Sequence, residues 1–175
     1  SFREVHLDPH ALNVAAVFSV LTRLTVPERP DLDLAKKVRL YADEEVEGVS
    51  SQDADKIRRE SPEEGMEGVS PRFVINALAG AISRSARRTL TAMDVLLSLK
   101  DAIEADARMD ARMKKQWKDF LVTARKEFYN RWVKEDVHRA LFASFEGEAQ
   151  ELLDKYLDEV EAALDQREVK DPITG

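Results

Sequence analysis

Apolar residues recur along most of this chain at spacings of three and four residues, which is the repeat of an amphipathic helix. In residues 9–24 they lie on nearly every side, which predicts a helix buried in a core. A second helix is expected from Asp31 or Asp33 to about Gly48, and a short charged helix from 53 to 60. No strand pattern accompanies these helices, so the chain is expected to be all-α.

Two later helices have clear starting signals. Ser70-Pro71 combines a capping side chain with a proline at the first helical position, where no backbone N–H is needed, and predicts a helix to about Arg88. Thr91 is expected to cap a further helix that ends near residue 106. Together with the two longer helices upstream, they predict a four-helix bundle within residues 9–106.

The remainder of the chain predicts a long helix and a returning partner. The long helical pattern begins near Asp110, and a break is expected near Glu146-Gly147. Lys and Arg are frequent before that break and Asp and Glu after it, which favours an antiparallel pair of helices. The predicted organisation is therefore a first domain of residues 1–107 and a second domain of residues 108–175.

Charge and composition narrow the function classes. The net charge of −7 and the pI of about 5.1 disfavour a binder of nucleic-acid phosphates. The absence of cysteine excludes disulfides and thiolate zinc sites and fits a reducing compartment. No apolar run is long enough for a membrane span, and a cytoplasmic protein is expected. Both ends of the sequence are expected to be boundaries within a longer protein.

The motifs of common phosphotransfer enzymes are missing. The chain has no G-x-x-x-x-G-K-[ST] phosphate loop, no G-x-G-x-x-G and no H-R-D or D-F-G motif. His6 and His10 have the spacing of a helical metal pair, but Asp8-Pro9 lies between them, so a polar or capping role is expected. The carboxylate pairs are expected to be solvated; they are Glu44-Glu45, Glu63-Glu64 and Asp158-Glu159.

Several cationic and aromatic side chains admit two interpretations. The cluster of Arg84, Arg87 and Arg88 lies in the last turn of its predicted helix, where cations complement the dipole, although it also suits contact between subunits. The basic run 108–118 has no glycine and lacks the regular interleaving of aromatic residues among its cations that a nucleic-acid site would have. Three aromatics could anchor a partner protein; Trp117 and Phe128 are expected in the core, and Trp132 is the better candidate for exposure.

Arg72 is the strongest candidate for binding a ligand. It occupies the second position of the helix that Ser70 is expected to cap, where free N–H groups and the helix dipole favour an anion. A guanidinium at that point suits a nucleotide phosphate. The competing interpretation is that Arg72 pairs with a nearby carboxylate such as Glu67.

Residues 64–78, EGMEGVSPRFVINAL, resemble the PrkA-type bacterial serine protein kinases, and the resemblance extends through residues 9–24, 143–150 and 169–175. That family looks like an AAA+ ATPase module followed by a C-terminal segment described as the kinase part. The resemblance implies that residues 9–106 are the helical lid of the AAA+ module. Arg72 then matches the sensor-2 position, which reaches toward the terminal phosphate of the nucleotide, with Ser70 as the N-cap of the sensor helix.

The resemblance also implies what the chain does not do alone. ATP and magnesium would be bound by an upstream AAA+ core, so this fragment is expected to bind no cofactor, to have no catalytic residue, and neither to hydrolyse ATP nor to transfer phosphate. Its expected partners are that core, a protein substrate and, in one option, further copies of the chain, with no nucleic acid. The implied function is a regulatory lid and C-terminal part of an ATP-dependent serine kinase. The alternative is a structural helical protein-interaction module without nucleotide sensing.

Overall fold

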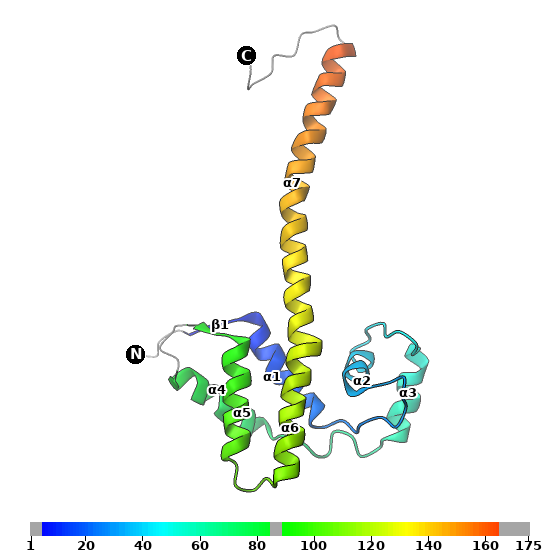
Figure 1. Cartoon of the computed structure of the whole chain (residues 1–175). Coiled ribbons are helices and arrows are strands. Elements are labelled where there is room, and N and C mark those ends of the chain that lie inside the picture. The colour runs from blue at the N-terminus through cyan, green and yellow to red at the C-terminus, as the bar shows by residue number, and fades with distance from the viewer. Residues whose placement is uncertain (1–4, 85–88, 165–175) are drawn as a thin grey trace. The chain divides into compact units, whose positions relative to one another are not determined.

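Helices dominate the computed structural model of this chain, which describes residues 5–84 and 89–164 (Figure 1). The expected all-α class is confirmed, with one addition, a pair of two-residue strands. In chain order the elements are β1 (His6–Leu7), α1 (Pro9–Leu21), α2 (Leu34–Tyr41), α3 (Ser51–Glu60), α4 (Pro71–Arg84), β2 (Thr89–Leu90), α5 (Ala92–Ala105), α6 (Ala111–Thr123), the π-helix η1 (Ala124–Tyr129) and α7 (Asn130–Leu164).

The helices begin at the capping residues that the sequence indicates. Asp8 accepts a hydrogen bond from the backbone N of His10 at 2.9 Å, and Asp33 and Asp110 cap α2 and α6 in the same way. Thr91 begins α5 with a capping box in which Asp94 bonds back to the Thr91 backbone. Each such cap stabilises its helix by about 1 kcal/mol.

The main core surrounds α1, as its nearly continuous apolar sequence predicts. Phe18 and Leu21 are fully buried, and the core continues through α4, α5, α6 and η1. Trp117 of α6 meets Phe18 and Phe73 edge to face, with ring centroids 6.1 Å and 6.0 Å apart. This packing positions the start of α4 against both α1 and α6.

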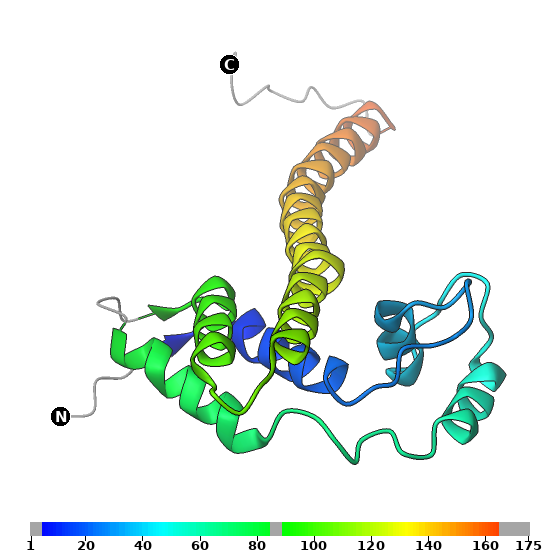
Figure 2. The same cartoon turned by 60° about the horizontal axis from the view of Figure 1, so that its bottom comes forward.

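A smaller core forms between α2 and α3. Figures 1 and 2 show these two helices side by side, apart from the helices around α1. The buried residues of this cluster are Leu32, Leu40, Val46, Ala54 and Ile57. Asp43 turns the chain after α2 with a φ of 57°, so the helix ends at Tyr41 rather than near Gly48.

The short parallel pair β1–β2 contradicts the expectation that no strand is present. His6 pairs with Thr89 and Leu7 with Leu90. Strands of two residues are too short to produce an alternating pattern, so only the tertiary approach of these segments forms them. The backbone N of Asp8 adds a 3.0 Å hydrogen bond to the carbonyl oxygen of Leu90.

The predicted break at Glu146-Gly147 is wrong, and with it the predicted antiparallel pair. Helix α7 runs without interruption from Asn130 to Leu164, so the two proposed partners belong to one helix. A glycine inside a helix costs only about 1 kcal/mol relative to alanine, and the neighbours of Gly147 are mostly strong helix formers.

Two compact units meet between Trp132 and Val133, and each is described by itself. The first holds both cores and includes α6 and η1. In the second, the described residues 133–164 belong to one helix. The predicted domain boundary at residues 107 and 108, and the lid-like arrangement of the bundle, stay predictions. None of the described helices combines the length and the apolar character that crossing a membrane requires.

Candidate functional site

The start of α4 is built as its sequence predicts. Pro71 is the first residue of the helix, and the Ser70 hydroxyl accepts a hydrogen bond from the backbone N of Phe73 at 3.2 Å. The partly buried ring of Phe73 packs against the main core. Arg72 immediately precedes Phe73 and lies in the first turn of the helix.

Arg72 is exposed, and among the described residues it makes no hydrogen bond or ion pair. The alternative that Arg72 pairs with Glu67 therefore has no support in the structure. A guanidinium that no group of residues 5–84 and 89–164 neutralises, at the positive end of a helix of 14 residues, is available to an anion.

Arg72 lines a surface hollow between α4 and α5 of about 480 Å³. Ser70 and Asn76 contribute polar groups to the same wall, and Asp101 is the acidic residue that lines it. Arg84 and Arg108 also line the hollow. Three arginines against one carboxylate make the hollow positive overall.

The other two arginines of the hollow are held by protein partners. Arg84 Nη2 donates to the Ser98 hydroxyl at 2.8 Å and lies 3.7 Å from Asp101. Arg108 donates from Nε and Nη2 to the two carboxylate oxygens of Asp106, at 2.9 Å and 2.6 Å. These bonds lower the pKa of Asp106 to about 2. Arg72 thus differs from its neighbours in having its charge uncommitted.

The segment before α4 is fastened to the end of α1. Arg23 donates from Nη2 to the carbonyl oxygen of Val69 at 2.8 Å and from Nη1 to that of Gly65 at 3.2 Å. The Thr22 hydroxyl adds a third hydrogen bond, which it accepts from the backbone N of Val69 at 3.1 Å. These contacts fix where the chain enters α4, and so where Arg72 stands.

Gly68 lies where this segment approaches α1 most closely. Its φ is 132°, and a Cβ atom there would stand 2.6 Å from Arg23 Cγ and 2.9 Å from the Thr22 carbonyl oxygen. The carbonyl oxygen belongs to the backbone and cannot turn aside. A side chain at this position would meet both a forbidden backbone conformation and a collision.

We expect Gly68→Ala to lower the free energy of unfolding by about 2–3 kcal/mol, since both backbone strain and a clash oppose it. Gly65→Ala is the matched control, because Gly65 also has positive φ, 87°, but open space around its Cβ position. Urea unfolding followed by fluorescence measures both variants. Equal losses for the two would contradict the role of the close approach.

A buried ion pair holds the same segment to α2. The Lys37 side chain is 1% exposed, and its ammonium donates to Oε1 of Glu64. The backbone N of Thr25 donates to the same carboxylate at 2.7 Å, and the Tyr41 hydroxyl donates to its other oxygen at 3.1 Å. Burial, together with the adjacent Glu64 charge, raises the pKa of Tyr41.

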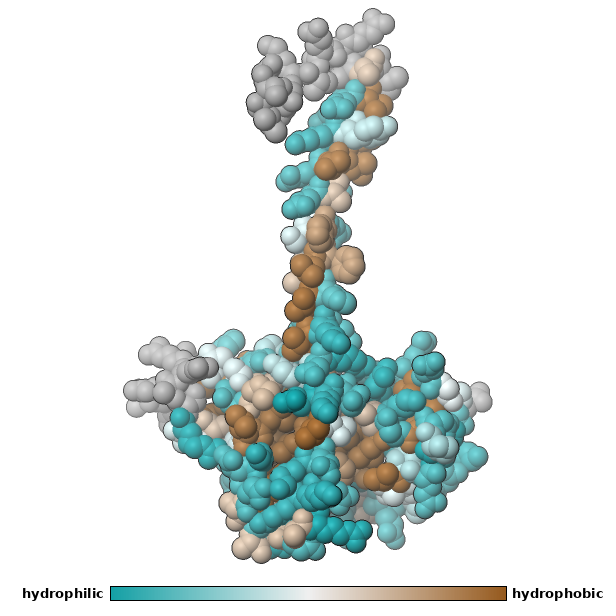
Figure 3. All heavy atoms as spheres, in the orientation of Figure 1, coloured by the Kyte–Doolittle hydropathy of each residue, from teal (hydrophilic) through white to brown (hydrophobic). Residues whose placement is uncertain are grey.

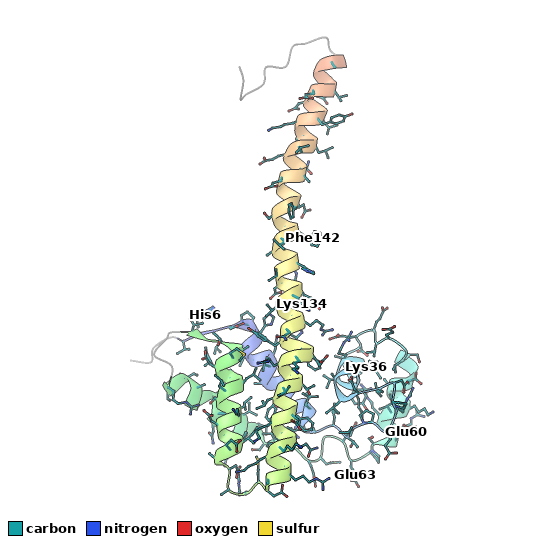
Figure 4. The ribbon with its side chains drawn as sticks, viewed as in Figure 1. His6, Lys36, Glu60, Glu63, Lys134 and Phe142 are labelled. Carbon is teal, nitrogen blue, oxygen red and sulfur yellow. The ribbon has the colours of Figure 1, made fainter. Side chains whose placement is uncertain are left out.

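The expectation that the carboxylate pairs are solvated is wrong for Glu64, whereas Glu44 is partly exposed and also forms ion pairs. Glu64 is enclosed as described, whereas its neighbour Glu63, labelled in Figure 4, is exposed. Glu44 accepts bonds from Arg131, at 2.6 Å and 3.1 Å, and from Arg39 at 3.0 Å. The bond from Arg131 is the main reason that the pKa of Glu44 is lowered. In the sequence, only the spacing of Lys37 and Tyr41 points to the enclosure of Glu64, because one helical turn between them places both polar side chains on the same face of α2.

The remaining candidates are not brought to this site. His6 lies in β1, and His10 stacks on Trp132 with ring centroids 5.5 Å apart. Phe128 is buried as expected, whereas Trp132 is half-buried rather than exposed. Arg87 and Arg88 lie outside the described residues.

The acids that meet the basic run come from α5 and the loop after it, not from the predicted acidic partner helix. Lys118 forms a 2.7 Å ion pair with Glu104, and Lys114 donates to the carbonyl oxygen of the same residue. Arg108 pairs with Asp106. Within residues 5–84 and 89–164, no group of three or more His, Asp or Glu is placed to hold a metal ion.

Comparison with known proteins connects this chain to one family. Residues 35–175 match the model of the PrkA serine protein kinase C-terminal domain. Over 172 residues the chain is 42% identical to a Bacillus subtilis (strain 168) protein named ATP-dependent protease PrkA. That match covers 98% of this chain but 27% of the relative. No solved structure matches the chain. The chain therefore belongs to the family of the PrkA serine protein kinase C-terminal domain.

Proposed function

We propose that residues 9–106 form a nucleotide-responsive lid in an ATP-dependent serine protein kinase. In this proposal Arg72 senses the terminal phosphate of ATP bound by a core domain upstream, and Ser70 holds the helix that carries it. The C-terminal domain model matches from residue 35, so it includes most of this lid; residues 108–175 form the remainder of the match and pass the lid movement to a protein substrate or a neighbouring subunit. The active protein is expected to work in the cytoplasm.

The observation that carries the proposal is the uncommitted charge of Arg72. The two other arginines of the hollow are bonded to Ser98 and Asp106, so an incoming anion would have to displace those partners. At Arg72 an anion would displace no partner from the described residues. Arg72 lies in the first turn of α4, where backbone N–H groups and the helix dipole add to its attraction for a phosphate. A planar guanidinium can also meet two phosphate oxygens at once.

The chemistry of the switch follows from the difference between ATP and ADP. Only ATP carries the γ-phosphate, so an interaction with that group stabilises the closed lid in one nucleotide state. The residues that would cradle the α- and β-phosphates, and the carboxylates for magnesium, are expected upstream, because no glycine-rich phosphate loop occurs among these 175 residues. The chain alone is therefore expected to be inactive.

The names of similar proteins give two activities, a serine protein kinase for the family and an ATP-dependent protease for the Bacillus subtilis relative. We choose the kinase because the family model covers residues 35–175. The sensing role of Arg72 is the same in either case, since both names imply the use of ATP. A purely structural interaction module would make Arg72 irrelevant to nucleotide binding.

The test is nucleotide affinity of the full-length protein, measured by titration calorimetry. For Arg72→Ala we expect ATP to bind about tenfold more weakly, a loss of about 1.4 kcal/mol, while ADP affinity is unchanged. Arg112→Ala is the control, because Arg112 is also exposed and makes no hydrogen bond or ion pair with the described residues. Equal ATP affinity in the wild type and Arg72→Ala would support the interaction-module alternative.

A further inference from the structure

An exposed apolar stripe runs along α7 in the second unit. Phe142 is 73% exposed and Leu152 72% exposed, values normal for a lysine rather than for large apolar side chains. Figure 3 shows hydrophobic patches along the length of α7, and Figure 4 labels Phe142 on this helix. The stripe comprises Leu141, Phe142, Phe145, Ala149, Leu152, Leu153, Tyr156, Leu157, Val160 and Ala163.

The spacing of the stripe is that of a helix built to pack along another helix. From Leu141 the steps are four, four, three, four, four and three residues, which is an 11-residue repeat. Such a repeat keeps one face aligned over many turns, because 11 residues complete three turns of about 3.67 residues each. A stripe of this length exceeds the scattered apolar exposure normal for a surface.

Acidic residues border the stripe. Between Glu146 and Glu161 the sequence holds seven acidic residues and one basic residue, Lys155. Glu148 and Glu159 stand directly beside the apolar face, since they precede Leu152 and Ala163 by four residues. Two such helices side by side would bring like charges together, so pairing of α7 with α7 is disfavoured.

The first unit carries an apolar groove whose rim has the opposite charge to the border of the stripe. Between α5 and α6 with η1 lies an apolar groove of about 430 Å³, with Leu96 and Leu121 at its base. Met93, Leu97 and Val122 line it while remaining 37–54% exposed. The two helices are neighbours in the main core, so the groove lies on a rigid support.

The rim of this groove is basic. Its charged lining residues are Lys100, Lys118, Arg125 and Lys126. Lys118 is committed to Glu104, whereas Arg125 and Lys126 are exposed and make no hydrogen bond or ion pair with the described part of the chain. An apolar floor with free cations at its edge is the complement of an apolar stripe edged by glutamates.

We propose that the acidic, apolar face of α7 docks into the α5–α6 groove of a second copy of this chain. Each copy supplies one stripe and one groove, so the contact is heterologous and leads to a reciprocal pair or to larger assemblies. The docked part is centred on Leu152 and Tyr156, where acidic residues are most frequent. Arg125 and Lys126 lie at the edge of the contact and attract the acidic border of the stripe, to which Glu148 and Glu159 belong. This inference does not depend on the role of Arg72.

The size of the groove limits the strength of this association. Met93 to Lys100 covers about two helical turns, so one groove accepts about two turns of the stripe. A contact of that size is smaller than a standard stable interface, and we expect reversible association that grows with concentration.

Sedimentation velocity of the chain over a concentration series tests the proposal. The wild type should shift toward species heavier than the monomer as concentration rises. Glu148→Lys with Glu159→Lys should weaken this association by about tenfold, because the border of the stripe then repels the cations at the rim of the groove. Arg125→Glu with Lys126→Glu should weaken it similarly. Circular dichroism checks that every variant keeps its helix content.

The matched control reverses charge on the opposite face of the same helix. Asp154→Lys with Asp158→Lys changes the net charge by the same amount as the stripe variant, but lies away from the apolar face, and should leave the association unchanged. Equal weakening by both pairs would show a net-charge effect and overturn the proposal. So would a wild type that stays monomeric throughout the series, or groove variants that associate normally.

Mixing the two weakened variants gives a decisive result. The groove variant keeps a native acidic stripe, and the stripe variant keeps a native basic groove, so together they can form the native contact. We expect the mixture to associate more strongly than either variant does alone. A mixture that remains monomeric would exclude docking between copies.

Discussion

Replacing Glu64 with alanine is expected to lower the free energy of unfolding by about 3–5 kcal/mol, the range for breaking one side of a buried ion pair. The variant leaves the Lys37 ammonium, 1% exposed, without its carboxylate. It also removes the acceptor of the Thr25 backbone N–H and of the Tyr41 hydroxyl. Three donors then lose a partner at once, and the loss is most costly for Lys37, which is the buried one.

Tryptophan fluorescence during urea unfolding measures this loss for the correct unit. The chain has two tryptophans, Trp117 and Trp132, and both lie in the first compact unit. Glu63→Ala is the matched control, because it deletes a neighbouring carboxylate that is exposed and should change stability by less than about 0.5 kcal/mol. A Glu64→Ala loss no greater than the control would contradict the enclosed pair.

A double variant separates the ion pair from simple packing. Lys37→Met with Glu64→Leu replaces both charges by apolar groups of similar length, and we expect it to be more stable than Glu64→Ala, because no buried charge is left unpaired. If the double variant is the less stable of the two, the charge of Lys37 is not the source of the effect.

Arg72→Ala in the full-length protein is expected to lower the rate of ATP turnover about 100-fold. This is the effect of deleting one preorganised donor to a charged transition state, and it corresponds to about 2.7 kcal/mol. The guanidinium is exposed and unpaired in the described chain, so its removal takes away no contact of the folded protein. Turnover at saturating ATP and magnesium, followed by phosphate release, is the measurement.

Stability and turnover together identify the cause of that loss. Arg72→Ala should leave the urea midpoint unchanged, whereas a fall in turnover caused by misfolding would lower both. Arg72→Lys should recover only part of the rate, because an ammonium cannot meet two phosphate oxygens in the fixed geometry of a guanidinium. Full turnover by Arg72→Ala would show that the lid does not sense nucleotide through this residue.

Glu64 and Arg72 lie in one continuous segment of the chain, and the contacts of this segment connect the two residues. Glu64 ties the segment to α2, and Arg23 and Thr22 tie it to the end of α1 through Val69. Ser70 then begins α4, with Arg72 in its first turn. The position of the Arg72 side chain therefore depends on the buried and close-packed groups that precede it.

Local signals in the sequence determined most of the secondary structure. The nearly continuous apolar run of α1 predicted burial, and the caps at Asp33, Thr91 and Asp110 start the helices where they were expected. The first turn of α4 was predicted equally well, because Ser70-Pro71 acts on backbone groups within three residues. Such signals are reliable because the interacting groups are neighbours along the chain.

Tertiary structure decided the features that join distant residues. The β1–β2 pair, the enclosure of Glu64 by Lys37 and the collision that only a glycine at position 68 avoids all connect segments far apart in sequence. The unbroken course of α7 could not be foreseen from Gly147, since the helix tolerates one glycine among strong helix formers. The sequence identified Arg72 as a candidate, but its freedom from Glu67 depends on which side chains surround it, and only the folded chain determines that.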